Sequence, residues 1–483
     1  MIQDNMKNNK INTANLILLT DSYKLGHFEM YPEKTERVYS YFESRNGAKY
    51  PYTVFTGLQH ILLEYLVGVV VTQADIEEAS ELAEAHFGNS KSLNRAMWEH
   101  IVNVWGGKLP VTIKAVPEGT VVPTNNVLMT VVNNGGKITA PLTNVLESLL
   151  THVWYPSSVA TLSRTTKEIL SKYLDDTSDS KNGLAFMLHD FSFRSNSSNE
   201  SAGVGGAAHL INFLGTDTLV AMQHARKYYA ADLKTLAYSV PASEHSVMSA
   251  LGKDGEIEVV KNLLNKYPTG ILSVVSDTYD IYNFVDNIVG KIFKENILNR
   301  DGVFVVRPDS VTPTHPTPES EVVWILTSLW NNFGGNINTK GFKVLNPKLK
   351  CLWGDGIDTD GIERILIACE NAGFSADNLV FGMGSNLAHS GVKRDTQRFA
   401  FKCSAQLQDG IWVDVFKDPK DKSKASKKGQ LRLLKSAIDG HLYTAQKSPD
   451  ENDGMEDMLV TVFENGELKK FYTFDEIRKN AKL

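Results

Sequence analysis

The sequence predicts an α/β protein, in which a barrel of parallel β/α units follows an α+β N-terminal domain. The main observation is a plan repeated from about residue 270, where a short apolar run ends in an acidic or Gly-rich break. Its copies are ILSVVSD (271–277), VFVVRPDS (303–310), KCLWGDGID (350–358) and NLVFGMGS (378–385). Helix-length amphipathic stretches such as 318–331 and 359–372 lie between them. This alternation is typical of parallel β/α units, and in a barrel the loops after the strands face one mouth.

The first part of the chain has a different pattern. Residues 111–133 alternate apolar and polar side chains around two turns, which predicts a small antiparallel sheet. Residues 72–104 are rich in Ala, Glu and Leu and predict helical structure. The expected organisation is a polar leader over 1–14, an α+β domain over 15–150 on which segments from about 390–483 pack, and a barrel catalytic domain over 151–389.

Composition excludes several classes of protein. With 483 residues, 42% hydrophobic and 22% charged, the chain is typical of a soluble globular protein. A net charge of -6 favours neither nucleic acid nor an anionic membrane as partner. The leader lacks a signal-peptide core, and the longest apolar run, near 65–71, is too short to span a bilayer. Three widely separated cysteines, Cys351, Cys369 and Cys403, indicate a reducing compartment without structural zinc. We therefore expect a cytoplasmic protein.

Polar residues at the predicted strand ends suit a sugar phosphate. GDG (354–356) and GMGS (382–385) leave backbone amides exposed where a helix begins, and such amides bind phosphate. Arg307 adds a planar charged fork for phosphate oxygens. Carboxylates at the same ends suit ribose hydroxyls or Mg²⁺, namely Asp277, Asp309 and Asp355. The alternative for either Gly-rich loop is an ordinary turn.

The middle of the chain suits a flat heteroaromatic ligand. Phe191, in HDFSFR, can stack on such a ring, an interaction of about 0.5–1.5 kcal/mol beyond area burial. Asp217, in GTDT, can accept a hydrogen bond from a carboxamide and would repel a carboxylate. The alternative is a core Phe and a turn Asp.

Two motifs are misleading, and two others are ambiguous from the residues alone. GVGGAA (203–208) matches a dinucleotide-binding fingerprint, but the preceding residues are polar and form no buried strand. The phosphate-binding loop G-x-x-x-x-G-K-[ST] does not occur, so use of ATP cannot rest on it. From composition alone, the charge run 417–430 is interpreted as a solvated surface loop. From its sequence neighbours alone, His245, in SVPASEHS (239–246), is interpreted as an ordinary loop histidine.

Motifs in order along the chain resemble the nicotinamide phosphoribosyltransferases of the type II phosphoribosyltransferase family. They are TDSYK (20–24), VYSYFESR (38–45), HDFSFR, GTDT, SVPASEHS, SVVSDTYDIYN (273–283), RPDS, GDG, FKCS (401–404) and YTFDEIRKNA (472–481). The resemblance implies an irregular α/β barrel with a β-rich N-terminal domain, acting as a homodimer with active sites at the subunit interface. It also implies transfer of phosphoribosyl from 5-phosphoribosyl 1-pyrophosphate to nicotinamide, with Mg²⁺, and with ATP as co-substrate.

The resemblance assigns a role to each matching residue. Phe191 is expected to stack on nicotinamide, with Tyr23 of the neighbouring subunit on the other face, while Asp217 binds the amide. The residues expected to act on the sugar pyrophosphate are Arg194 and Arg307 at phosphate and pyrophosphate, and Asp277 and Asp309 near the ribose and Mg²⁺. The other substrate-binding residues are Ser273, Gly354, Asp355, Gly384 and Ser385, with Arg394 and Lys402 from the partner chain and Lys427 as a further phosphate ligand.

His245 is the fourth catalytic residue that the resemblance implies, beside Arg307, Asp277 and Asp309. Its match in this family is transiently phosphorylated by ATP, which improves binding of the sugar substrate. An imidazole is a competent nucleophile when a neighbour fixes its tautomer, and Glu244 is a candidate for that neighbour. The bond-forming step itself is expected to depend on positioning and charge stabilisation, without a general base.

Departures from the family pattern and rival functions remain. Ser192 and Val311 stand where Gly is common, and Ser385-Asn386 replace part of a glycine run. Because Val311 cannot easily adopt a positive φ, the loop after Asp309 is expected to take a different path.

The rival functions are that of a nicotinate phosphoribosyltransferase, which Asp217 disfavours, and that of a non-catalytic nicotinamide- or nucleotide-binding protein. Without the resemblance, a sugar-phosphate barrel enzyme is the default.

Overall fold

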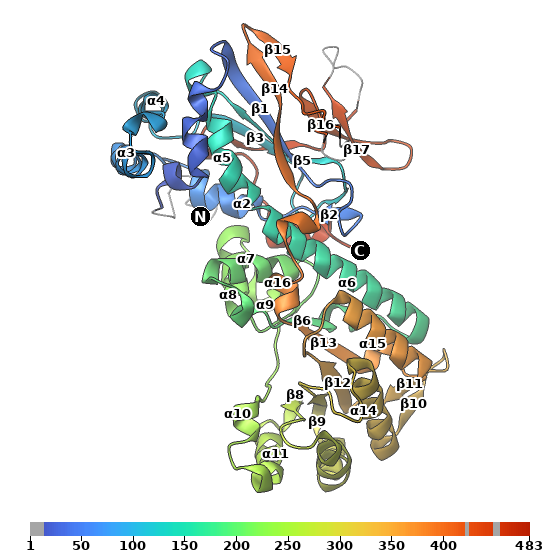
Figure 1. The fold of residues 1–483 in the computed structure, drawn as a ribbon. Coiled ribbons are helices and arrows are strands. Elements are labelled where there is room, and N and C mark those ends of the chain that lie inside the picture. The colour runs from blue at the N-terminus through green and yellow to red at the C-terminus, as the bar shows by residue number, and fades with distance from the viewer. Residues whose placement is uncertain (1–13, 421–424, 448–454) are drawn as a thin grey trace. The chain divides into compact units, whose positions relative to one another are not determined.

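The computed structural model describes residues 14–420, 425–447 and 455–483 (Figure 1). Most of the predicted polar leader and four residues of the charge run therefore lie outside the described residues. The described chain divides into two compact units. The N-terminal unit comprises residues from 1–161, 225–231 and 393–482, and the barrel unit comprises 162–224, 232–392 and 483.

The N-terminal unit is built on an antiparallel sheet. Within the described residues, seven strands form it in the order β15-β14-β1-β5-β3-β18-β19. Its strands, with the two-stranded pairs β2-β4 and β16-β17, are β1 (Thr35–Glu43), β2 (Tyr52–Val54), β3 (Val111–Ala115), β4 (Val121–Pro123), β5 (Val127–Asn133), β14 (Ala400–Gln408), β15 (Ile411–Asp414), β16 (Leu431–Lys435), β17 (Leu442–Gln446), β18 (Val460–Glu464) and β19 (Glu467–Leu468). Alternation decides which face each strand buries, since Val111, Ile113 and Ala115 are buried while Lys114 is exposed.

The helices of the N-terminal unit confirm that residues 72–104 are mainly helical. They are α2 (Leu58–Ile61), α3 (Gln73–Phe87), α4 (Arg95–Trp105), α5 (Leu142–Thr151) and α17 (Phe474–Asn480). The segment 72–104 contains two of them, α3 and most of α4. Gly88, with φ 73°, ends α3 in the left-handed conformation, and the Asn94 side chain caps the start of α4.

The barrel unit contains parallel strands in the order β7-β6-β13-β12-β9-β8, six within the described residues (Figure 1). The strands of this unit are β6 (Leu188–Asp190), β7 (Gly215–Thr216), β8 (Thr269–Val275), β9 (Asp301–Arg307), β10 (Gly335–Ile337), β11 (Lys343–Leu345), β12 (Leu349–Trp353) and β13 (Leu379–Met383). The four runs predicted as strands are neighbours in one parallel sheet, so their polar ends lie at one edge, as the sequence predicts.

Helices connect these strands. They are α6 (Trp154–Thr177), α7 (Asn199–His209), α8 (Leu219–Tyr229), α9 (Leu233–Leu236), α10 (His245–Met248), α11 (Glu256–Lys266), α12 (Ile281–Asn283), α13 (Lys294–Asn299), α14 (Pro318–Phe333), α15 (Thr359–Asn371) and α16 (Ser385–Ala388), of which α6 and α8 share residues with the N-terminal unit. The predicted helices 318–331 and 359–372 are confirmed as α14 and α15. Thr317 begins α14 with a capping box and Pro318 follows in its first turn.

An extended segment closes the barrel. Tyr238 forms a parallel bridge with Gly215 of β7, and Ala242 forms one with Ser273 of β8. The segment from Tyr238 to Ser243 therefore joins the two edge strands of the sheet. Pro241 lies inside it and cannot donate a backbone hydrogen bond, which explains why the closure is irregular.

Two further features agree with the sequence. The dinucleotide-like fingerprint at 203–208 lies inside the buried helix α7 instead of a strand-to-helix loop. No helix among the described residues combines the length and apolar character needed to cross a lipid bilayer.

Candidate active site

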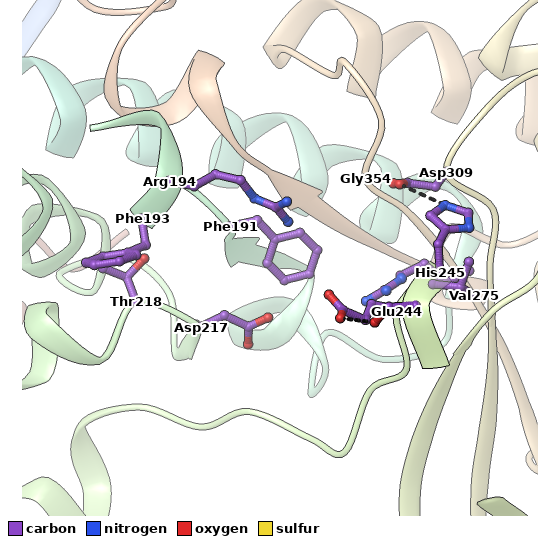
Figure 2. A pocket seen from close by; sticks show the side chains of 12 residues that line it. Phe191, Phe193, Arg194, Asp217, Thr218, Glu244, His245, Val275, Asp309 and Gly354 are labelled. Atoms are coloured by element: carbon purple, nitrogen blue, oxygen red, sulfur yellow. Dashed lines mark hydrogen bonds and ion pairs between the residues drawn. The ribbon is translucent and has the colours of Figure 1, made fainter. Parts of the chain in front are cut away.

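A cavity of about 350 Å³ opens at the carboxyl ends of the parallel strands (Figure 2). The residues that line it come from several strand ends and from the segment after the barrel closure: Phe191, Phe193, Arg194, Asp217, Thr218, Glu244, His245, Ser246, Val275, Arg307, Asp309 and Gly354. The structure thus brings together seven of the residues that the sequence predicts as site residues, because parallel strands place their ends at one edge.

Phe191 follows β6 and its ring is held against glycine. Its N–H donates to the carbonyl of Met383 at 3.0 Å. A Cβ added at Gly382 would lie 2.0 Å from Cε2 of the Phe191 ring, and one at Gly354 would lie 3.5 Å from the same atom. Gly382, which the sequence suggested only as part of a phosphate loop, therefore makes room for this ring.

Gly382→Ala is expected to raise the KM for a flat heteroaromatic substrate that stacks on Phe191 by about tenfold, because the methyl group forces the ring out of its position for stacking. Steady-state kinetics with varied base would measure this change. The control is Gly183→Ala, where φ is -83° and an added Cβ meets no heavy atom within 4 Å. An unchanged base KM in Gly382→Ala, equal to that of the control, would refute the assignment of the Phe191 ring to the base.

Asp217 follows β7 and faces the same cavity as the Phe191 ring (Figure 2). Its N–H donates to the carbonyl of Asp190 at 2.9 Å, and its Oδ1 accepts a hydrogen bond from the Ser239 hydroxyl at 2.5 Å. Ser239 belongs to the closing segment and was not predicted as a site residue. The carboxylate therefore has one fixed oxygen, while the side chain still reaches the cavity.

Arg307 ends β9 beside several carboxylates. Burial lowers the pKa of its guanidinium, and Asp309, Asp217 and Asp277 oppose that shift, while Arg194 adds to it. Nη2 donates to the carbonyl of Ser243 at 2.5 Å, which orients the guanidinium plane. An arginine remains charged in proteins, so this end of the cavity holds a fixed cation flanked by acids.

His245 begins α10 and lies between two acidic loops. Its Nε2 is 3.5 Å from Oδ2 of Asp309 and 3.9 Å from Oδ1 of Asp277. Its Nδ1 is 3.2 Å from the Thr278 hydroxyl. The prediction that Glu244 is the neighbour that fixes the imidazole is wrong. Its carboxylate accepts a hydrogen bond from Ser246, and Thr278 contacts the imidazole instead. The reason is local, because adjacent residues at a helix start point in different directions.

Asp277 and Asp309 are joined to each other by their loops. Oδ2 of Asp277 accepts hydrogen bonds from the Asp309 N–H at 3.0 Å and from the Ser310 hydroxyl. The Asp277 side chain is 7% exposed, and its Oδ1 has no hydrogen-bond partner among the described residues. That oxygen lies 3.9 Å from Nε2 of His245, which is too far for a hydrogen bond, so it can still bond a polar ligand.

The Gly-rich loops lie at the next strand ends. Gly354 lines the cavity, and partial burial, followed by the charges of Asp309 and Asp277, raises the pKa of Asp355. Gly384 precedes the short helix α16, which Ser385 begins. The Asn386 amide donates to the carbonyls of Ile357 and Gly356 at 3.0 and 3.4 Å, and so links the two Gly-rich loops. Asn386 is one of the two residues that replace part of the family's glycine run, and its side chain makes this link possible.

Ser273 lies on a second, larger cavity of about 640 Å³ inside the barrel. This cavity is lined by apolar side chains, several of them from strands, and by polar ones, and it shares Phe191, Asp217 and Arg307 with the first cavity. The Ser273 hydroxyl is buried and, among the described residues, lacks a hydrogen-bond partner. It is therefore available to a ligand that enters the barrel from the Phe191 end.

The residues assigned to the partner chain lie in the N-terminal unit. Tyr23 is 60% exposed, and the Lys24 Nζ lies 5.6 Å from its ring centroid. Burial lowers the pKa of Lys402, Glu147 opposes the shift, and the nearby cations Arg45, Lys24 and Arg394 add to it. Lys402 thus lies near three other cations, of which Lys24 pairs with Glu147 and Arg394 with Asp395.

Lys427 is engaged within its own unit. Its ammonium pairs with the buried carboxylate of Glu43 and donates to Oδ1 of Asn125 at 3.2 Å. Its N–H donates to the Tyr41 hydroxyl at 2.8 Å. A phosphate would therefore share Lys427 with Glu43, and its role as a phosphate ligand stays a prediction.

Two departures from the family pattern cause no backbone strain. Val311 does not adopt a positive φ, and Ser192 has φ -91°. The Ser192 N–H donates to the buried Asp190 carboxylate at 2.8 Å, which fixes the loop that carries Phe191. The sequence does not reveal four of the contacts made by site residues, because only the folded chain brings the partners together. These partners are Thr278, Ser239, Gly382 and Asp190.

The chain is similar in sequence to known phosphoribosyltransferases over nearly its whole length. Residues 186–467 match the sequence model of the nicotinate phosphoribosyltransferase (NAPRTase) family, and residues 15–113 match that of the nicotinamide phosphoribosyltransferase N-terminal domain. The chain is 43% identical to a nicotinamide phosphoribosyltransferase of Xanthomonas campestris pv. campestris (strain 8004), over 97% of this chain and 98% of the relative. It is 34% identical to a nicotinamide phosphoribosyltransferase of Acinetobacter baylyi, over 97% of each chain.

The fold is similar to that of a solved structure, the nicotinate-nucleotide pyrophosphorylase from Pyrococcus furiosus. The TM-score is 0.57 at 16% identity, and the match covers 97% of this chain and 95% of that one. The architecture is that of the type II phosphoribosyltransferases, as the sequence predicts. The chain belongs to the nicotinate phosphoribosyltransferase family, and its N-terminal domain and extended sequence similarity group it with the nicotinamide phosphoribosyltransferases.

Proposed function

We propose that this protein transfers the phosphoribosyl group of 5-phosphoribosyl 1-pyrophosphate to nicotinamide, a salvage step toward NAD. The observation that carries the proposal is one cavity that combines an aromatic ring and a carboxylate, Phe191 and Asp217, with Arg307 and Asp309. The first pair suits a pyridine carboxamide, and the second suits a sugar pyrophosphate. Relatives that bear the name of this activity cover nearly the whole chain.

The chemistry needs no proton transfer at the reacting atoms. The lone pair of the pyridine nitrogen forms a bond to C1 of the ribose, and the C1–O bond to pyrophosphate breaks. Pyrophosphate leaves with the bonding electrons, and nicotinamide mononucleotide remains. Arg307 stabilises the negative charge that develops on the leaving group, while the Phe191 ring holds the base in line.

Asp217 supports nicotinamide over nicotinate. Its carboxylate accepts a hydrogen bond from the carboxamide NH₂, whereas the carboxylate of nicotinate would face a like charge. Ser239 holds one oxygen of Asp217 and thereby orients the other. Like-charge repulsion in a partly desolvated cavity disfavours the acid.

Mg²⁺ fits the acidic end only in the presence of substrate. Among the described residues, no group of three His, Cys, Asp or Glu side chains forms a complete metal site. Mg²⁺ usually keeps several waters and binds through one or two carboxylates plus substrate phosphates. Asp277, with its unpartnered buried oxygen, and Asp309 would hold the ion. When bound, Mg²⁺ neutralises charge on the pyrophosphate.

ATP is proposed to phosphorylate His245. A nitrogen of the imidazole forms a bond to the γ-phosphorus of ATP, the bond to the bridging oxygen breaks, and ADP leaves. Thr278 at Nδ1 and the Asp309 carboxylate near Nε2 orient the ring. The half-exposed His245 side chain leaves the imidazole accessible to ATP.

A second copy of the chain is proposed to complete each site. The cationic surface around Lys402 and the exposed ring of Tyr23 suit an anionic, aromatic ligand. A homodimer would place Tyr23, Arg394 and Lys402 of one chain at the barrel cavity of the other. Sedimentation of the purified protein tests this assembly, and a monomer at assay concentration would exclude it.

The cytoplasm is the proposed compartment. Cys351, Cys369 and Cys403 are free thiols in the structure. Burial raises the pKa of Cys369 to about 12, so this thiol stays protonated and unreactive at neutral pH.

A parallel turnover assay tests the proposed function. Purified protein receives phosphoribosyl pyrophosphate and Mg²⁺ with nicotinamide or nicotinate, each with and without ATP. We expect mononucleotide from nicotinamide at a kcat/KM at least about a hundredfold above that for nicotinate, because the repulsion at Asp217 is worth about 3 kcal/mol. Preference for nicotinate would reverse the assignment of Asp217. No product from either base would support the non-catalytic binding protein.

A further inference from the structure

The two loops that carry the catalytic carboxylates are joined a second time, away from the cavity. The Asp277 loop leads into α12, and the Asp309 loop leads into α14. The Tyr282 hydroxyl, from α12, lies 2.6 Å from the Thr312 hydroxyl and 2.9 Å from Nδ1 of His315, both from the Asp309 loop. One phenol therefore bridges the two loops behind the site.

The bridge continues into helix α14. The Thr312 N–H and hydroxyl both donate to Oε2 of Glu321, at 3.3 and 2.8 Å. Glu321 lies in the first turn of α14 and is fully buried. Trp324, one turn later, packs edge to face on the Tyr282 ring with centroids 4.5 Å apart. The loop is thus fixed to the rigid end of a helix.

The hydrogen bonds can run in one direction only. The Thr312 hydroxyl donates its one hydrogen bond to the Glu321 carboxylate. It therefore accepts a hydrogen bond from the Tyr282 hydroxyl. The Tyr282 oxygen then accepts from N–H at Nδ1 of His315. The chain runs from His315 through Tyr282 and Thr312 to Glu321, and each donor finds an acceptor. Aligned chains of this kind reinforce one another where they are shielded from water, and the bonds of this chain are partly buried.

The Asp309 loop has few other means of holding its path. Residues 308–317 contain no helix or strand, and the Asp309 side chain is 50% exposed. At the cavity, the loop is held by the bonds that Asp309 and Ser310 donate to Asp277. A loop attached only at that point would let Asp309 move relative to His245.

We propose that Tyr282 and Thr312 are positioning residues of the sugar-pyrophosphate site, which hold the Asp309 loop in register with the Asp277 loop. The proposal rests on the proposed function, because its effect is exerted on the carboxylates assigned to the ribose and Mg²⁺. Neither residue lines the cavity. Loss of the bridge therefore weakens binding of the sugar substrate and leaves the base site at Phe191 unaffected.

Tyr282→Phe and Thr312→Val test this proposal, since each removes a hydroxyl and keeps the shape of the side chain. We expect the KM for phosphoribosyl pyrophosphate to rise about five- to tenfold, because both variants lose the hydrogen bond between the Tyr282 and Thr312 hydroxyls that joins the two loops. The KM for nicotinamide should stay within twofold. Thr312→Ser restores the hydroxyl and should return the sugar KM to near the wild-type value. The matched control is Thr327→Val on α14, where the lost hydroxyl bonds only the carbonyl of Val323 among the contacts described.

Calorimetric titration of phosphoribosyl pyrophosphate with Mg²⁺ gives a second readout that needs no turnover. A five- to tenfold weaker Kd in both variants supports the proposal even if the protein proves inactive on either base. Sugar affinity within twofold of wild type in both variants would overturn it. Equal losses for sugar and base, accompanied by a fall in Tm that Thr327→Val does not show, would also overturn it, because they indicate a role in stability alone.

Discussion

Arg307→Ala is expected to lower kcat/KM for phosphoribosyl pyrophosphate by about 10³-fold, as for removal of a preorganised charge stabiliser in an active site. Two effects act together. The leaving pyrophosphate loses its fixed cation, and the carboxylates of Asp309, Asp217 and Asp277 lose the charge that compensates them. Removal of one partner from a partly buried charge cluster is costly because the remaining charges stay desolvated.

Steady-state kinetics with varied sugar substrate measures this loss. Arg307→Lys keeps the charge but loses the planar fork and the Ser243 contact, and we expect it to recover only part of the rate. Arg364→Ala is the matched control, because Arg364 lies in the same unit, at the surface, and pairs with Glu319. If Arg307→Ala kept kcat/KM within tenfold of this control, Arg307 would not be the pyrophosphate ligand.

His245→Ala is expected to abolish the stimulation of turnover by ATP. The rate ratio with and without ATP should fall to about one, and the sugar KM measured with ATP should rise about ten- to hundredfold, the value of a charge-assisted hydrogen bond. The reason is that the variant has no nucleophile at the position where Thr278 and the Asp277 and Asp309 loops converge. Rates with and without ATP and incorporation of labelled γ-phosphate into the protein would both be measured.

The control for this variant is His441→Ala, an exposed histidine of the N-terminal unit. It should incorporate label and respond to ATP as the wild type does. Persistent labelling or persistent stimulation in His245→Ala would place the phosphoryl acceptor elsewhere. Absence of stimulation in the wild type as well would remove ATP from the proposed function and leave the transfer reaction intact.

Much of the barrel could be predicted from the sequence because its signals are local. An apolar run with a polar end predicts a buried parallel strand wherever it stands, so ILSVVSD and VFVVRPDS become β8 and β9. The same logic places Arg307 and Asp309 at one edge, whereas Phe191 and Asp217 follow the very short strands β6 and β7, which the sequence does not mark as apolar runs. The break inside the helical segment 72–104 could not be predicted, since Gly88 adopts a left-handed conformation that amphipathic composition does not reveal.

Tertiary structure alone decided which side chains meet. The closing segment supplies Ser239 to Asp217, Thr278 replaces Glu244 beside His245, and Gly382 accommodates the Phe191 ring. Each pair joins residues more than twenty positions apart, so no spacing in the sequence records it.

The sequence by itself determined the strand pattern, the chemistry at the strand ends and, through its ordered motifs, the family resemblance. The partners of those chemical groups were settled only when the chain closed into a barrel, because a hydrogen bond depends on distance and angle in space. The same holds for Lys427, whose charge the sequence assigns to phosphate and the structure pairs with Glu43. Residue types limit what a site can do, and packing selects which of those possibilities is realised.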